Sequence, residues 1–158
     1  ATGLHQKAPE KITFYWRLKE HDKFIREIGI KNYSEILPRM SRDFLITFNN
    51  PIDAKEAEKT LNSFICVEDS NKIFRVDNRG ESLFVELIYE KNIKEDMRIF
   101  ASWIDKEVES FKSYVAFVAI KNGEHDGIGY LTSNVPMDIP AEIKLTEVKE
   151  ILKEQVLN

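Results

Sequence analysis

Residues 114–131 read YVAFVAIKNGEHDGIGYL, an apolar run followed by a glycine-rich polar turn. The run over 114–120 lacks polar alternation and is rich in Val, Phe and Ile, which is typical of a strand covered on both faces. Loops at the ends of buried strands are held by a rigid scaffold while they stay open to ligands. The sequence therefore predicts an interior strand at 114–120 that delivers a polar cluster at its end.

Alternating apolar residues mark further strands, and apolar spacings of three and four residues mark helices. The expected strands are 12–18, 43–48, 72–77, 82–89, 114–120 and 130–134, and the expected helices are 22–28, 51–63, 94–111 and 145–156. Asn50 and Pro51 supply an N-cap and a favourable first position for the second helix. The turn-prone DNRG at 77–80 predicts a hairpin, and the segment 32–41, which contains Pro38, is interpreted as a connection.

The elements over 43–120 follow the order strand, helix, strand, strand, helix, strand, which is the ferredoxin-like split βαβ order. The fold class is therefore predicted to be α+β, with two helices on one face of a four-stranded antiparallel sheet. The first and last strands of this unit, 43–48 and 114–120, should be neighbours. A strand from 12–18 or 130–134 should then cover the open edge of 114–120. Residues 1–42 and 121–158 are expected to flank this core within one domain spanning 1–158.

The composition is that of a soluble globular protein, with 42% hydrophobic and 32% charged residues in a chain of 158. No apolar run approaches the ~20 residues that cross a bilayer, so no membrane partner is expected. The net charge of −4 argues against a nucleic-acid partner. Cys66 is interpreted as a buried small hydrophobe. With no signal-peptide pattern, the expected location is cytoplasmic.

The polar turn places Glu124, His125 and Asp126 between glycines. Histidine is the commonest neutral metal ligand, and the glycines permit close backbone approach, so Glu124 and Asp126 are expected to contact a ligand beside His125. The alternative is an ordinary hairpin tip, because Asn-Gly and Asp-Gly are common turn formers. His5 is a second candidate, although terminal histidines in polar segments are usually solvated.

A sheet that binds single-stranded RNA is a further alternative. Its candidate side chains are Arg39, Arg42, Arg75, Arg79, Phe74 and Phe84. The aromatic motif of such sheets is absent and the net charge is negative, so a solvated basic face is the favoured interpretation. His21, beside Asp22, is interpreted as a surface or capping residue.

Two short stretches resemble the metal motifs of the alkaline phosphatase superfamily, which includes phosphodiesterases, phosphatases and sulfatases. TGLHQ at 2–6 is similar to the family's T-x-D-H-G motif, and GEHDGIG at 123–129 is similar to its G-x-H-x-x-x-G motif. IKLTEVKEIL at 143–152 is similar to the family's closing segment. By this resemblance His5 and His125 are zinc ligands, and residues 7–113 correspond to an insertion between the two motifs.

Leu4 stands where the family has an aspartate, and no nucleophile can be assigned. The resemblance therefore implies a portion or degenerate relative of a metal-dependent phosphoric or sulfuric ester hydrolase that is inactive in isolation. Zinc is the expected cofactor, and the expected partners are a small-molecule ester or ligand and the rest of a longer polypeptide. The rival hypothesis is a non-enzymatic, ferredoxin-like module that binds a ligand or partner. Only the first hypothesis requires His5 to lie near His125.

Overall fold

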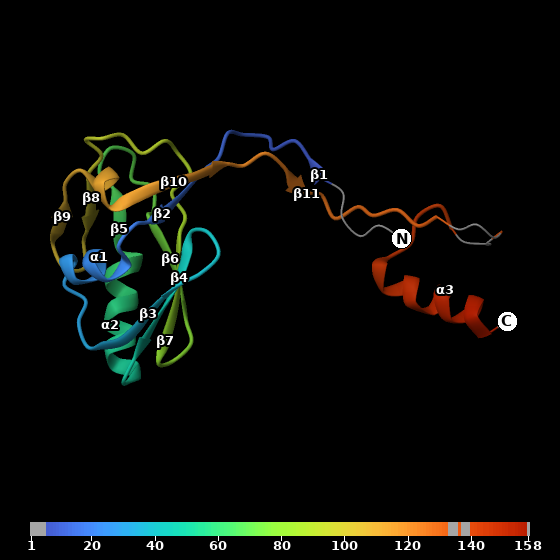
Figure 1. The fold of residues 1–158 in the computed structure, drawn as a ribbon, viewed down its shortest axis with the longest axis horizontal. Helices are drawn as coiled ribbons and strands as arrows, with labels where there is room; N and C mark the ends of the chain where they lie inside the picture. The colour runs from blue at the N-terminus through green and yellow to red at the C-terminus, as the bar shows by residue number, and fades with distance from the viewer. Residues whose placement is uncertain (1–5, 133–135, 137–139, 158) are drawn as a thin grey trace. The chain divides into compact units, whose positions relative to one another are not determined.

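The computed structural model describes residues 6–132, 136 and 140–157. The chain forms two compact units: the larger spans 8–124, and the smaller combines 1–7 with 125–158. Helices and antiparallel strands occur together, so the predicted α+β class is confirmed (Figure 1). Among the described residues, none of the helices combines the length and the apolar character that a membrane span needs.

Most of the regular elements belong to the larger unit. In chain order they are β2 (Phe14–Leu18), α1 (His21–Glu27), β3 (Tyr33–Pro38), β4 (Asp43–Phe48), α2 (Pro51–Asn62), β5 (Phe64–Cys66), β6 (Phe74–Asn78), β7 (Ser82–Leu87), β8 (Ile99–Ala101), β9 (Lys106–Val108), the 3-10 helix η1 (Phe111–Tyr114) and β10 (Val115–Ile120). The smaller unit contains β1 (Gln6–Lys7) and α3 (Leu145–Leu157), and β11 (Glu124–His125) lies at the boundary in the sequence between the two units.

An antiparallel sheet in the order β3-β4-β7-β6 carries most of the larger unit. β4 and β7 alternate buried and half-buried residues, as period-two sequences do when one face packs on a core. Phe44 and Ile46 lie opposite Val85 and Leu83, and all four side chains are buried. α2 packs against this sheet (Figure 1). The predicted hairpin of the strands near 72–77 and 82–89 is confirmed by the pairing of β6 with β7.

The predicted N-cap of α2 and the predicted turn of the β6–β7 hairpin are both present. Asn50 Oδ1 accepts hydrogen bonds from the backbone N–H groups of Ile52 and Asp53, which satisfies the first turn of α2. In the hairpin, Asn78 Oδ1 accepts from the N–H of Gly80, which has a φ of +85°. Glycine adopts this left-handed conformation without steric cost, so the turn forms where the sequence placed it.

The segment interpreted as a connection is a strand. Tyr33–Pro38 forms β3, which pairs with β4 and occupies the edge of the sheet. Pro38 is the last residue of β3, opposite Phe44. Proline cannot donate to a ladder, but an edge strand leaves one side of its backbone unpaired, so proline is tolerated there.

The helix predicted over 94–111 is wrong. This segment forms β8 and β9, which pair with each other, and then η1. Asp105 has a φ of +49° and Ser110 has a φ of +50°, and such left-handed residues interrupt a right-handed helix. The side chains of Ile99, Ala101 and Val108 are buried, as an alternating strand pattern places them.

The ferredoxin-like arrangement is also wrong, because β10 pairs with β2 and not with β4. The prediction that a strand from 12–18 covers 114–120 is confirmed. The two strands form a separate two-stranded ribbon, however, so β10 is not an interior strand of a larger sheet. Phe117 is 52% exposed and Ile120 is 49% exposed, so the predicted burial on both faces does not hold. The strand expected at 130–134 extends beyond the described residues, whereas the helix expected at 145–156 is present as α3.

An aromatic cluster forms the centre of the larger unit. The ring of Phe24 on α1 is fully buried, and its centroid lies 5.4 to 6.4 Å from the centroids of four other rings. Those rings are Phe64, Phe74, Phe111 and Tyr114. Because Phe74 is buried in this core, it cannot stack on RNA bases, and the RNA-binding sheet loses an essential side chain.

Candidate functional site

β11 contains His125 and pairs with β1. β1 begins at Gln6, the residue that follows His5 in the sequence, while His5 itself lies outside the described residues. The side chain of His125 is exposed. Strand pairing thus joins β11, which contains His125, to β1, which directly follows His5 in the sequence.

Glu124 and His125 are successive residues of β11, and successive strand residues direct their side chains to opposite faces. Glu124 Oε2 lies 2.7 Å from Lys121 Nζ, forming an ion pair. This ion pair raises the pKa of Lys121, since the hydrogen bond and the carboxylate charge both favour the ammonium form. Glu124 is therefore poorly placed to share an ion with the neighbouring imidazole of His125.

Asp126 takes part in the turn that follows β11. Its Oδ1 accepts a hydrogen bond from the backbone N–H of Ile128 at 3.0 Å, and the intervening Gly127 has a φ of +78°. This is the geometry of an Asx-type turn, in which the side chain stabilises the backbone two residues on. The contact favours the turn interpretation of this residue over a direct ligand contact.

A complete metal site is not formed within the part of the chain that the structure describes, since no three His, Cys, Asp or Glu side chains come together there. Structural zinc needs four protein ligands, and catalytic zinc usually takes three. Zinc at His125 would therefore require donors from outside residues 6–132, 136 and 140–157.

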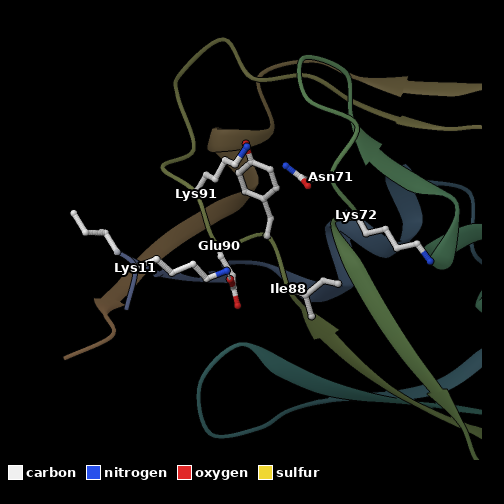
Figure 2. Close-up of a pocket in the computed structure, with 8 residues that line it drawn as sticks. Lys11, Asn71, Lys72, Ile88, Glu90 and Lys91 are labelled. Atoms are coloured by element: carbon white, nitrogen blue, oxygen red, sulfur yellow. Dashed lines mark hydrogen bonds and ion pairs between the residues drawn. The ribbon is translucent and has the colours of Figure 1, made fainter. Parts of the chain in front are cut away.

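The larger unit also has surface hollows, one of which is shown in Figure 2. Its volume is about 500 Å³, and lysines are prominent in its lining. Lys11 Nζ lies 2.8 Å from Glu90 Oε2, and Lys91 Nζ lies 2.9 Å from Asp69 Oδ2. Figure 2 shows Lys11 and Glu90 meeting on one side while Lys72 extends away from them. Two of its three lysine charges are thus already balanced by carboxylates.

A neighbouring hollow of about 400 Å³ contains Cys66, Asp69 and Tyr89. Cys66 is buried, as the sequence predicted, and its thiol donates to Glu68 Oε2 at 3.1 Å. Burial and this hydrogen bond raise the pKa of the Cys66 thiol, so the neutral form predominates at neutral pH. Because the thiolate is the reactive form, Cys66 is not an activated nucleophile.

A third hollow, of about 340 Å³, lies where β2, the start of α1 and the turn between β3 and β4 meet. We call it the basic hollow; its polar lining residues are Arg17, Lys19, His21, Arg39, Ser41 and Asp43. The His21 ring packs edge-on against Phe44, with centroids 4.8 Å apart. Burial, followed by the charge of Arg17, lowers the pKa of His21. His21, interpreted from the sequence as a surface or capping residue, is the first residue of α1 after the N-cap Glu20, and it lies half-buried in this hollow.

The arginines considered as a basic patch are mostly paired with acids. Arg42 and Arg75 both contact the carboxylate of Glu86, and Arg79 Nε lies 2.8 Å from Asp77 Oδ2. Arg39 differs, because it lines the basic hollow. The sequence signal for this hollow was weak, since Arg17 is on β2 and Arg39 follows β3, far apart in the chain.

Comparison with known proteins gives no match among protein-family models, curated proteins or solved structures.

Proposed function

We propose that this chain contributes part of a metal-dependent hydrolase of phosphoric or sulfuric esters, in which His5 and His125 are zinc ligands. The observation that carries this proposal is the pairing of β1 with β11, which brings together the segments that follow His5 and contain His125. His5 is the residue that directly precedes β1 in the sequence.

The division of the chain supports the same proposal. Residues 1–7 group with 125–158, and 8–124 form a compact unit of their own. The resemblance to the alkaline phosphatase superfamily assigns its two metal motifs to these same terminal segments and assigns an insertion to the residues between them. A compact inserted unit can be accommodated in a loop of a host domain when its two ends lie close together. The antiparallel pairing of β2 with β10, near the two ends of 8–124, brings these ends together.

This chain would supply only some of the groups that a zinc-dependent ester hydrolase needs. Zinc would act as a Lewis acid on the ester and would help to generate the nucleophile. The residues of this chain would hold the ion through imidazole nitrogens, while the missing carboxylate at Leu4 and the unassigned nucleophile require the rest of a longer polypeptide. We therefore expect no turnover of phosphomonoesters, phosphodiesters or sulfate esters by this chain alone.

The test is a calorimetric zinc titration of the full 158-residue chain, alongside a panel of chromogenic esters. Wild type should bind zinc weakly, and His125→Ala and His5→Ala should each weaken it further, because each removes one of two imidazole ligands. His21→Gln is the matched control, since it removes a histidine from the larger unit, and it should leave zinc binding unchanged. Zinc binding that is indifferent to both His5→Ala and His125→Ala would refute the assignment of the ligands. Ester turnover abolished by His125→Ala would refute the expectation that the chain is incomplete.

A further inference from the structure

We propose that the basic hollow binds a small oxyanion, with phosphate and sulfate esters as the chemical class of its ligand. Every residue that lines it belongs to the unit 8–124. The proposal therefore goes beyond the proposed hydrolase function and does not rest on His5, His125 or zinc.

The β2–β10 ribbon provides one wall of the basic hollow. Arg17 is the exposed residue between the buried Trp16 and Leu18, so strand alternation directs its side chain away from the core. Ala116 on β10 is the register partner of Arg17 and also lines the hollow. Because an alanine side chain is a single methyl group, the position opposite Arg17 leaves space for a ligand.

The turn between β3 and β4 also lines the basic hollow, through Arg39, Ser41 and Asp43. The backbone N–H of Arg39 donates to the carbonyl oxygen of Asp43 at 2.9 Å, which closes the turn. Asp43 Oδ1 accepts from the N–H of Ser41 at 3.5 Å, so the one carboxylate of the hollow is directed toward the backbone of Ser41. The Ser41 hydroxyl and the Arg39 guanidinium remain as donors for an oxyanion.

Among the described residues, most of the positive charges of the basic hollow have no carboxylate partner. Within the described residues, neither Arg17 nor Arg39 has a hydrogen bond or ion pair from its side chain. Lys19 Nζ donates to the neutral carbonyl oxygen of Ser113 at 3.1 Å, so its charge is also left without a carboxylate partner. Three cations therefore face one acid, whereas the other arginines discussed above pair with Glu86 or Asp77.

Arginine side chains are well suited to binding oxyanions, because the planar guanidinium offers several donors that match the oxygens of phosphate and sulfate. His21 adds a ring nitrogen at the partly buried side of the hollow. A bound anion would offset the charge of Arg17, which now disfavours protonation of His21, and would so raise the pKa of that imidazole. His21 is thus a built-in reporter of binding.

The experiment is an NMR titration of the full chain with inorganic phosphate, sulfate and glycerol 3-phosphate, each against chloride at constant ionic strength. We expect saturable shifts of the His21 ring and the Ser41 amide, and an upward move of the His21 titration midpoint at saturation. Removing two guanidinium contacts in Arg17→Gln/Arg39→Gln should weaken binding about tenfold or more. Arg79→Gln is the matched control: it removes an exposed arginine that pairs with Asp77, and it should bind like wild type.

The arms of the experiment separate the possible outcomes. Binding of glycerol 3-phosphate with the affinity of inorganic phosphate would assign the oxyanion group itself as the ligand, and tighter binding would assign a phosphate ester; both support the proposal. Shifts that rise linearly without saturation, or a double variant that binds like wild type while its thermal unfolding is unchanged, would overturn it. Tight binding of a fluorescent single-stranded oligonucleotide that is lost in the double variant would also overturn it in favour of nucleic acid.

Discussion

Lys91 Nζ lies 2.9 Å from Asp69 Oδ2, and the hydroxyl of Tyr89 donates to the same oxygen at 3.2 Å. The other carboxylate oxygen of Asp69 accepts from the backbone N–H of Asn71 at 3.0 Å. Burial alone would raise the pKa of Asp69, but the hydrogen bonds from Lys91 and Asn71 outweigh it and hold that pKa well below its usual range. Asp69 thus fastens the β5–β6 connection to the segment after β7.

Asp69→Asn should destabilise the fold at pH 7 by about 1–3 kcal/mol, because an amide is a poorer acceptor for a charged donor. The folded-state pKa of Asp69 lies below the ordinary 3.8, so its contribution is present above about pH 4 and is lost as the pH falls through the folded-state value. Urea unfolding of both proteins from pH 7 down to about pH 2 measures this difference and its decline below pH 4. Asp96→Asn, which changes an acid in the same hollow, is the control, and an equal loss in both variants would contradict the prediction.

His21 should titrate below its ordinary 6.5, because burial and the nearby charge of Arg17 both disfavour the imidazolium. An NMR titration of the ring measures the midpoint. Arg17→Gln should raise it by removing one cation, whereas Lys23→Gln, on the same short helix, should leave it nearly unchanged. Since the unfolded chain binds the proton more readily than the folded one, protonation of His21 lowers the stability as the pH falls below 6.5.

Phe24→Ala should cost about 3–5 kcal/mol, because the ring is fully buried and its removal leaves a cavity among four aromatic neighbours. Phe117→Ala is the matched comparison: this ring is 52% exposed and should cost about 1 kcal/mol or less. Chemical denaturation of both variants tests the pair. A similar cost at the two positions would show that the β2–β10 ribbon is covered in solution and not open.

Asn50→Ala should destabilise α2 by about 1 kcal/mol, because the N–H groups of Ile52 and Asp53 lose the side-chain oxygen that they share. Asn50→Ser keeps an acceptor at the N-cap and should retain most of the stability. The measurement is thermal unfolding followed by circular dichroism. If serine were as damaging as alanine, the cap would not be the source of the effect.

The local sequence determined the elements that depend on near neighbours. The alternation of 43–48 and 82–87, the Asn50-Pro51 helix start and the turn at Gly80 each need only a few residues to be recognised, and the structure contains all of them. Their cause lies in φ preferences and in short-range hydrogen bonds, which a sequence states directly.

The tertiary structure decided which strands pair, and it decided the structure of segments whose sequence fits more than one conformation. Residues 94–111 carry apolar side chains at spacings that suit a helix, yet pairing in the β5-β8-β9 sheet makes strands of 99–101 and 106–108. The apolar run 115–120 is equally compatible with an interior strand and with an open ribbon, and only its partner β2 selects the ribbon. Such choices depend on contacts between distant residues, where burial outweighs local propensity.

The candidate binding sites also depend partly on the sequence alone and partly on the tertiary structure. The sequence alone was enough to select His125 and its turn as a candidate site, because a histidine flanked by glycines can be recognised without knowing the fold. It could not reveal that Arg42 and Arg75 share Glu86 while Arg17 and Arg39 face one hollow without a carboxylate partner among the described residues. Whether a charge is paired or available depends on distances of a few ångströms between segments that only folding brings together.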